Sequence, residues 1–345
     1  MKTEEPSDFR FIQRCIQLAK NALGNTYPNP LVGSVIVHDG KIIGEGWHHK
    51  AGEAHAEVNA IRSVKNKTLL KESTLYVNLE PCSHFGKTPP CSDLIIANKI
   101  PRVVIGCQDP FEKVNGSGIQ KLKEAGIEVL VNVGEVESQE LNSRFFTYHQ
   151  KKRPYILLKW AQSQDGYIAP EKEIRTEKKA VFLSSKEDQI RVHQWRKEEE
   201  AILIGVQTLI DDNPSLTTRW VDGKNPIRIV LDPNNRAKKN ANVFTDNNAS
   251  ILHFTRKSLG LKKECSASDF LNASLNVLFE QKISSVLVEG GSATLQHFID
   301  QNIWDEARIF VAEKKLVRGV KAPEISKQIV QYSIGYTHLK NKASK

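Results

Sequence analysis

Residues 74–91 read TLYVNLEPCSHFGKTPPC: a run of β-branched and aromatic residues, then Cys82, a loop rich in proline and glycine, and Cys91. The run at 74–79 predicts a strand. Upstream, residues 55–57 read HAE at the start of an expected helix. A helix, a strand and a further short helix after Cys91 indicate an α/β fold in this region.

The rest of the first half also alternates helices and strands. Apolar residues between Asp8 and Leu23 recur at helical spacing, and Ser7 precedes them as an N-cap. Two β-rich runs around Asp39-Gly40 predict a hairpin. The other expected elements are a helix at 55–64, strands at 102–106 and 127–131, and a helix at 118–126. We therefore expect helices packed on one central sheet.

The pattern restarts after residues 145–155, FFTYHQKKRPY, a basic stretch that we expect to be a linker or the domain boundary. The expected strands of the second half lie at 155–160, 201–205, 226–232, 251–254, 284–291 and 307–313, and the expected helices at 185–200, 268–281 and 294–302. Residues 333–345 are expected to form a loose basic tail. A length of 345 residues favours two domains, and we place them at 1–149 and 150–345.

The composition is that of an ordinary globular protein, with 26% charged and 39% hydrophobic residues. The first residues, MKTEEPSDFR, are acidic where a secretory signal is apolar, and no run approaches the ~18 apolar residues of a membrane span. We therefore expect a cytoplasmic protein without a membrane partner. The net charge of +9 is spread over scattered lysines and arginines, which we interpret as solvated surface with a few arginines kept for phosphate.

One imidazole and two thiolates, from His55, Cys82 and Cys91, form a candidate site for one zinc ion. Three protein ligands leave the fourth tetrahedral position to water, whose pKa the metal lowers toward neutrality. Glu57 lies two residues from His55 and is predicted to move that water's proton to a ring nitrogen and to departing ammonia. This H-x-E and P-C arrangement is the signature described for zinc nucleobase deaminases, although the loop between the two cysteines is longer here.

The alternative interpretations of the same residues are a structural zinc site and cysteines that bind no metal in a core. A closed site needs a fourth protein ligand, which His84 or His48 could provide. Such a site has no use for Glu57 beside the ligands, so we favour the catalytic interpretation.

The surrounding motifs resemble one family, the bifunctional riboflavin-biosynthesis deaminase-reductases. The likeness rests on TYPNPLVG at 26–33, on the motif G-x-G-x-H at 44–48, and on the whole loop at 81–91. The resemblance implies a cytidine-deaminase-like three-layer domain, with Asn29, His48 and Lys87 at the pyrimidine or ribose-phosphate site. An amide can read a pyrimidine edge and a lysine suits an anionic or carbonyl oxygen. Asn29 between two prolines is alternatively a turn residue.

The resemblance continues through the second half, for which it implies a dihydrofolate-reductase-like α/β domain using NADPH. The matching stretches are KWA-x-S-x-DG at 159–166, H-x-x-R at 193–196, the segment 201–219 and VEGG at 288–291. The implied cofactor contacts are Ala161, Thr208 and Asp212, and the implied substrate contacts are Leu216 and Glu289. Where the family commonly has tryptophan, this chain has Phe182.

Four further residues of the second half are candidates on chemical grounds. Gly290 and Gly291 could let a phosphate approach backbone N–H groups at the start of a helix. Arg196 and Arg219 are candidate clamps for the substrate phosphate. Taken alone, a Gly-Gly pair is more often a tight turn and a lone arginine more often a surface residue. No G-x-G-x-x-G follows a strand, which disfavours a Rossmann site.

The resemblance implies two consecutive reactions of riboflavin biosynthesis. The first is zinc-dependent hydrolytic deamination of 2,5-diamino-6-ribosylamino-4(3H)-pyrimidinone 5′-phosphate, and the second is NADPH-dependent reduction of its ribosyl group to ribityl. One alternative is a nucleoside or tRNA deaminase with an unrelated second domain. Another is a zinc-stabilised nucleic-acid-binding protein without catalysis, although we expect no nucleic-acid partner. The sequence does not determine the oligomeric state, although it is compatible with a homo-oligomer. It also does not determine whether the reductase prefers NADPH or NADH.

Overall fold

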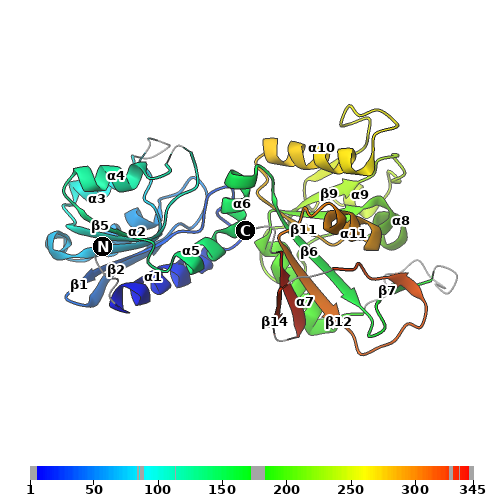
Figure 1. Cartoon of the computed structure of the whole chain (residues 1–345), viewed down its shortest axis with the longest axis horizontal. Coiled ribbons are helices and arrows are strands. Elements are labelled where there is room, and N and C mark those ends of the chain that lie inside the picture. Colours follow the sequence, from blue (N-terminus) through cyan, green and yellow to red (C-terminus); the bar gives the residue numbers. More distant parts are fainter. Residues whose placement is uncertain are drawn as a thin grey trace. The chain divides into compact units, whose positions relative to one another are not determined.

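The computed structural model describes residues 6–83, 85, 89–112, 114–171, 183–325, 329–333 and 335–341. The chain forms two compact units, Met1–Lys152 and Arg153–Lys345 (Figure 1). Among the described residues, no helix is long and apolar enough to cross a membrane.

The first unit is built on a five-stranded sheet with the order β2-β1-β3-β4-β5. Its strands are β1 (Gly33–His38), β2 (Lys41–Trp47), β3 (Thr74–Leu79), β4 (Arg102–Cys107) and β5 (Glu128–Val131). The predicted hairpin joins β1 and β2 through Asp39 and Gly40, whose φ angles of 47° and 71° suit a tight two-residue turn. Strands β3, β4 and β5 run parallel, so their carboxyl ends meet at one edge of the sheet.

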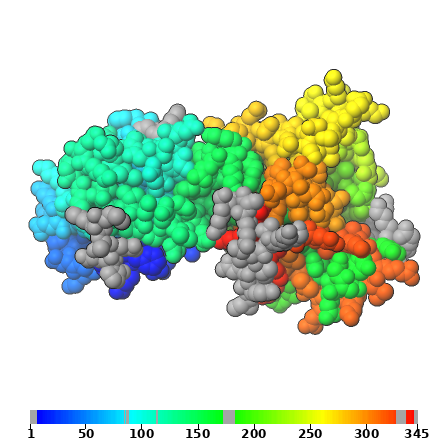
Figure 2. All heavy atoms as spheres, in the orientation of Figure 1, coloured from blue at the N-terminus to red at the C-terminus, as the bar shows by residue number. Residues whose placement is uncertain are grey.

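Helices cover both faces of this sheet, which makes three layers. The helical segments are α1 (Pro6–Ala19), the 3-10 helices η1 (Lys20–Ala22) and η2 (Lys67–Glu72), α2 (Ala56–Ser63), α3 (Cys91–Ala97), α4 (Ser117–Glu124), α5 (Glu135–Leu141) and α6 (Ser143–Lys151). Alternate residues of β1 face opposite sides: Val35 and Val37 pack with α1, whereas Ile36 packs with α2, α3 and α4. On the face shown in Figure 2, this unit exposes chiefly its later segments, coloured cyan to green.

The second unit is built on an eight-stranded sheet with the order β10-β9-β8-β11-β6-β12-β15-β14. The strands of this sheet are β6 (Tyr155–Gln162), β8 (Ala201–Gly205), β9 (Ile227–Leu231), β10 (Ile251–Phe254), β11 (Ser285–Val288), β12 (Glu306–Val311), β14 (Ile329–Ser333) and β15 (Tyr336–Lys340). The first six in the order are parallel, whereas β15 is antiparallel to both β12 and β14. A separate pair joins β7 (Tyr167–Pro170) to β13 (Gly319–Lys321).

Helices again lie on both faces of the parallel part. They are α7 (Lys186–Glu198), α8 (Val206–Asp212), α9 (Asn242–Thr245), α10 (Ala267–Glu280) and α11 (Ser292–Asp300). In β6, Ile156 and Leu158 join the core that includes α10 and α11, whereas Leu157 joins the core that includes Trp195 of α7. Continuous apolar strands such as β6 are expected where both faces of a parallel sheet are covered.

Two sequence-based expectations need correction. The stretch at 145–155 does contain the boundary between the two units, after Lys152, but it is helical as far as Lys151, within α6, and Thr147 there is buried, so it is not a linker over its whole length. The predicted loose tail contains β15, which lies between β12 and β14. Leu339 of β15 is only 6% exposed and packs in the main core of the second unit, so burial of an apolar residue holds this segment in the sheet.

Candidate functional site

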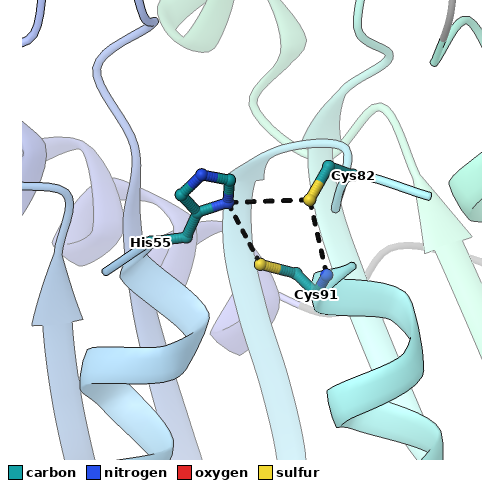
Figure 3. A group of neighbouring side chains, drawn as sticks. All are labelled: His55, Cys82 and Cys91. Carbon is teal, nitrogen blue, oxygen red and sulfur yellow. Dashed lines mark hydrogen bonds between the residues drawn. The ribbon is translucent and has the colours of Figure 1, made fainter. Parts of the chain in front are cut away.

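The three predicted zinc ligands converge in the first unit (Figure 3). His55 is the N-cap of α2, Cys82 follows the end of β3, and Cys91 is the first residue of α3. The Nδ1 atom of His55 lies 3.6 Å from the Sγ atom of Cys82 and 3.3 Å from that of Cys91. All three ligand atoms lie within 4.8 Å of one another.

This arrangement fits a zinc ion. Zinc–nitrogen and zinc–sulfur bonds of about 2.0 to 2.3 Å in tetrahedral geometry place ligand atoms roughly 3.5 to 3.8 Å apart. The hydrogen bond with Cys91, opposed by burial and supported by His55, lowers the pKa of the Cys82 thiol. A lowered thiol pKa favours the thiolate form, which is the form that binds metal.

Glu57 is buried beside these ligands, in the first turn of α2, and is 3% exposed. Burial raises the pKa of its carboxyl group, the negative charge of Cys82 raises it further, and His55 opposes both effects. A carboxyl group whose pKa is raised toward neutrality can both accept and donate a proton, as general acid–base catalysis requires.

The structure brings Asn29 and His48 together next to His55. The ring of His48 donates from Nδ1 to the carbonyl oxygen of Ala54 at 3.1 Å, so its Nε2 accepts from the Asn29 amide at 3.1 Å. Its ring centroid lies 5.4 Å from that of His55. Because both nitrogens of His48 already have partners, His48 is a poor fourth zinc ligand. Lys87 and His84 lie outside the described residues.

In the second unit, Arg196 and Glu289 form a largely buried bidentate ion pair, with side chains 12% and 10% exposed. Nε and Nη2 of Arg196 donate to the two carboxylate oxygens of Glu289 at 2.7 and 2.8 Å. Burial raises the pKa of Glu289, but the charge and hydrogen bonds of Arg196 outweigh it and leave that pKa at about 2. Nη1 of Arg196 donates to the carbonyl oxygen of Thr217 at 3.0 Å. Arg196 thus commits three of its five N–H donors within the protein.

The segment that carries Leu216 and Arg219 is held by α7 on one side. The backbone N–H of Arg219 donates to Nδ1 of His193 at 2.9 Å, and the His193 ring stacks on Trp220. Leu216 has a φ of 55°, which is unusual for leucine, and its side chain is 2% exposed. Any contact of Leu216 with a ligand must therefore come from its backbone.

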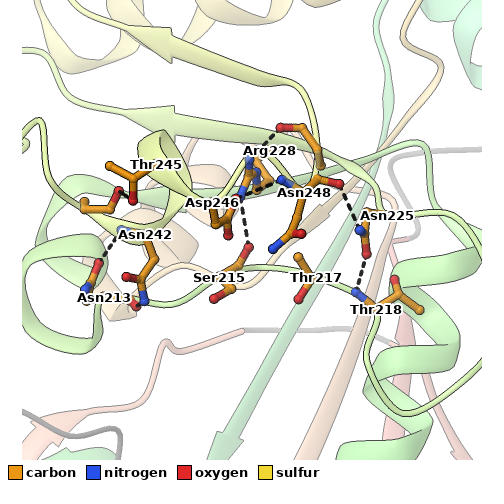
Figure 4. Close-up of polar contacts among 12 residues, drawn as sticks. Asn213, Ser215, Thr217, Thr218, Asn225, Arg228, Asn242, Thr245, Asp246 and Asn248 are labelled. Carbon is orange, nitrogen blue, oxygen red and sulfur yellow. Dashed lines mark hydrogen bonds and ion pairs between the residues drawn. The ribbon is translucent and has the colours of Figure 1, made fainter.

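A polar network holds the same segment on its other side (Figure 4). Arg228 of β9 is 1% exposed and donates to Asp246 at 2.6 Å and to the carbonyl oxygen of Ser215 at 3.4 Å. The side chain of Asn225 accepts from the backbone of Thr218 at 2.7 Å. These contacts fix the backbone on both sides of Leu216.

The predicted cofactor residues lie at the carboxyl edge of the second sheet, where β8, β11 and β6 are neighbours. Ala161 is near the end of β6, and Thr208 and Asp212 lie one turn apart on α8, which follows β8. Gly291 follows β11 as the N-cap of α11 and donates from its backbone to the Thr208 hydroxyl at 2.9 Å. A Cβ atom on Gly290 would lie 2.9 Å from that of Thr294, so this close approach requires glycine. The carboxyl edge of parallel strands is where open α/β sheets commonly bind ligands.

Sequence reasoning assigned no role to Lys159, Arg228 or Glu80, which lie near the predicted site residues; Arg228 and Glu80 are buried and Lys159 is partly buried. Lys159 lies in β6, burial lowers the pKa of its amino group, and the nearby Glu289 charge opposes that effect. A charged residue within an apolar strand, as in YILLKW and PIRIVLD, was the available signal. Phe182, the departure from the family pattern, lies outside the described residues.

Comparison with known proteins gives a match in each half of the chain. The cytidine and deoxycytidylate deaminase zinc-binding region matches residues 6–107, and the RibD C-terminal domain matches residues 154–325. The riboflavin biosynthesis protein RibD of Aquifex aeolicus is 40% identical over 337 residues, which cover 95% of this chain and 93% of that protein. RibD of Escherichia coli is 34% identical over 90% of this chain and 88% of its own length.

Solved structures show the same relationship. The diaminohydroxyphosphoribosylaminopyrimidine deaminase/5-amino-6-(5-phosphoribosylamino)uracil reductase of Thermotoga maritima superposes with a TM-score of 0.83 at 36% identity, covering 96% of this chain and 97% of that one. Acinetobacter baumannii RibD superposes with a TM-score of 0.82 at 30% identity, covering 97% of this chain and 98% of that one. Each of these known proteins therefore contains counterparts of both halves of this chain.

Proposed function

The chain belongs to the RibD family of bifunctional riboflavin-biosynthesis enzymes, which join a deaminase to a reductase, and from that membership we propose how its own residues perform the two reactions. The deaminase is zinc-dependent and the reductase uses NADPH. The observation that carries the residue assignment is the convergence of His55, Cys82 and Cys91 beside the buried Glu57. We assign the deaminase to residues 1–149 and the reductase to residues 150–345.

The first proposed reaction is hydrolytic deamination of 2,5-diamino-6-ribosylamino-4(3H)-pyrimidinone 5′-phosphate. His55, Cys82 and Cys91 would hold one zinc ion, which when bound acts as a Lewis acid and makes hydroxide available near neutral pH. Glu57 takes one proton from the attacking water and delivers it to the ring nitrogen. It then moves the remaining hydroxyl proton of the addition product to the amino group, so the carbonyl forms, the C–N bond breaks and ammonia leaves. Its buried position supports this role, because a carboxyl group that is shielded from solvent exchanges protons with the substrate and not with bulk water.

Asn29, His48 and Lys87 are proposed to bind the pyrimidine or its ribose phosphate. His48 accepts from the amide nitrogen of Asn29, so the Asn29 carbonyl oxygen is the end that can accept from a pyrimidine N–H. The contact of His48 with Ala54 ties this amide to the residue before His55. The pyrimidine would then be oriented relative to the zinc ligands by a chain of hydrogen bonds.

The second proposed reaction is reduction of the ribosyl group to ribityl, with hydride supplied by NADPH when it is bound. Ala161, Thr208, Asp212, Gly290 and Gly291 would hold the cofactor at the carboxyl edge of the sheet. The substrate would be bound by four residues of the same edge: Arg196, Leu216, Arg219 and Glu289. Since Arg196 is largely committed to Glu289 and Thr217, we propose that Arg219 is the main phosphate ligand.

The substrate class of the family is a ribosylaminopyrimidine phosphate. We further propose a cytoplasmic enzyme that acts without nucleic acid or membrane, with a homo-oligomer as a compatible state. A nucleoside or tRNA deaminase with an unrelated second domain is not favoured, because the RibD C-terminal domain accounts for residues 154–325.

The test follows ammonia release and NADPH consumption together on the zinc-loaded protein given the diaminopyrimidinone ribosyl phosphate. We expect ammonia first and NADPH loss after it. Glu57→Gln should reduce ammonia release at least about 100-fold and still allow NADPH consumption when the deaminated pyrimidine is supplied. Ammonia release by Glu57→Gln at the wild-type rate would refute the assignment of Glu57, and no ammonia from the wild type would refute the deaminase.

A further inference from the structure

The first unit contains a buried carboxylate that the proposed reaction does not use. Glu80 lies between the end of β3 and the zinc ligand Cys82, and it is 4% exposed. Its backbone N–H donates to the carbonyl oxygen of Cys107 at 3.0 Å, which continues the pairing of β3 with β4. A buried carboxylate is costly unless hydrogen bonds compensate it, so its partners indicate its role.

Both carboxylate oxygens of Glu80 accept two backbone hydrogen bonds each. Oε1 accepts from the N–H groups of Gly118 and Ile119 at 2.9 and 3.2 Å. Oε2 accepts from those of Asp109 and Gly116 at 3.2 and 3.0 Å. These donors are 29 to 39 residues away along the chain, so Glu80 joins the end of β3 to a distant turn.

The Glu80 carboxylate accepts the hydrogen bonds that an N-cap side chain would otherwise accept at the start of α4. The N-cap residue of that helix is Gly116, with φ of 91° and no side chain that could accept a hydrogen bond. The N–H groups of Gly118 and Ile119 are the second and third of α4, which a cap side chain ordinarily satisfies. The beginning of α4 is therefore fixed to the residue that leads into Cys82.

Two further contacts hold α4 against the residues around Cys82. A Cβ atom on Gly118 would overlap the carbonyl oxygen of Pro81, so the helix touches the backbone immediately before Cys82. On the other side, the hydroxyl groups of Ser83 and Ser117 lie 2.6 Å apart in a hydrogen bond. The residues on both sides of Cys82 are thus attached to the first turn of α4.

We propose that Glu80 is a positioning residue that sets the place of the Cys82 thiolate in the zinc site, an inference that rests on the proposed function. Residues that orient a metal ligand without touching the metal typically contribute about 10- to 100-fold to affinity. Glu80 acts through the backbone: its carboxylate anchors α4, and α4 holds Pro81 and Ser83. Without the carboxylate, the segment that carries Cys82 loses the hydrogen bonds of Glu80 to α4, and the position of the Cys82 thiolate is less well defined.

The test compares Glu80→Gln with Asp8→Asn in the full-length protein. A glutamine side chain has one acceptor oxygen, so two of the four N–H groups would face an NH₂ group instead. Asp8 is a matched control, because it is 1% exposed and binds Arg102 and the Tyr76 hydroxyl in the same unit. Both variants should be less stable than the wild type, but only Glu80→Gln should alter the zinc site.

The measurements are Zn²⁺ affinity, by competition with a chromophoric chelator, and the absorption spectrum of the Co²⁺-substituted protein. We expect Glu80→Gln to bind Zn²⁺ about 10- to 100-fold more weakly and to shift the thiolate-to-cobalt bands, and Asp8→Asn to match the wild type in both. Wild-type affinity and an unchanged cobalt spectrum in folded Glu80→Gln would overturn the proposal.

A second variant keeps the carboxylate and moves the backbone instead. Gly118→Ala should displace Pro81 and weaken Zn²⁺ binding in the same direction, so it carries the test if Glu80→Gln does not fold. Wild-type affinity in Gly118→Ala would then count against the proposal. Failure of the proposed function is distinguishable, because the wild-type protein itself would then bind no Zn²⁺ or release no ammonia.

Discussion

Replacing Arg196 by methionine should destabilise the second unit by about 3–5 kcal/mol, because it leaves a buried carboxylate without its partner. The side chains of Arg196 and Glu289 are only 12% and 10% exposed, and two hydrogen bonds of 2.7 and 2.8 Å join them. The variant also removes the donor to the Thr217 carbonyl oxygen. In thermal unfolding this loss corresponds to a decrease of about 6–20 °C in the midpoint.

The loss should depend on pH with a definite sign. The pKa of Glu289 is lowered to about 2 in the folded protein, from an ordinary value of 4.5. The stabilisation by the pair is therefore complete above the ordinary pKa and disappears as the pH falls toward 2. The difference between wild type and Arg196→Met should be largest at neutral pH and shrink below pH 4.5.

Urea unfolding followed by tryptophan fluorescence measures this difference, since four of the five tryptophans (Trp160, Trp195, Trp220 and Trp304) belong to Arg153–Lys345. Arg191→Met on the same helix is the control, because Arg191 contacts the Tyr336 ring in a cation–π interaction worth only about 0.5–2 kcal/mol. The double variant Arg196→Met/Glu289→Leu should recover much of the loss. A loss below about 1 kcal/mol, or one that is independent of pH, would refute the reasoning.

The remaining predictions concern phosphate binding and the C-terminal strand. Arg219→Met should raise the KM of the reductase for the phosphorylated substrate and leave the KM for its dephosphorylated form nearly unchanged, because a phosphate clamp acts only on the phosphate; an equal effect on both would contradict the assignment. Leu339→Ala should destabilise the second unit by about 2–5 kcal/mol in urea unfolding, because Leu339 is 6% exposed. A loose tail would tolerate that change without measurable loss.

The features that the sequence predicts well are those encoded by neighbouring residues. The alternation of Val35, Ile36 and Val37 specifies a strand covered on both faces, and Asp39-Gly40 specifies the hairpin. The convergence of the three proposed zinc ligands could be anticipated because His55 and Cys91 stand at the starts of two helices and Cys82 follows a strand.

The features that the sequence does not predict depend on residues far apart in the chain. Arg196 and Glu289 are 93 residues apart, and nothing in either local motif indicates that they pair. The hydrogen bonds of Glu80 are likewise not indicated by its local sequence, because its four donors lie in and before α4. The sequence of β15, YTHLK, has only one buried apolar residue, Leu339, so it lacks the apolar alternation that indicates a strand. This segment is a strand because it pairs with β12.

The central claim is that zinc held by His55, Cys82 and Cys91 serves the deaminase alone. It is tested most directly by Cys91→Ser, with zinc content measured by atomic emission and both activities measured on the same preparation. We predict no bound zinc, no ammonia from the diaminopyrimidinone ribosyl phosphate, and NADPH consumption like that of the wild type when the deaminated pyrimidine is supplied. Full zinc content with undiminished ammonia release would contradict the claim.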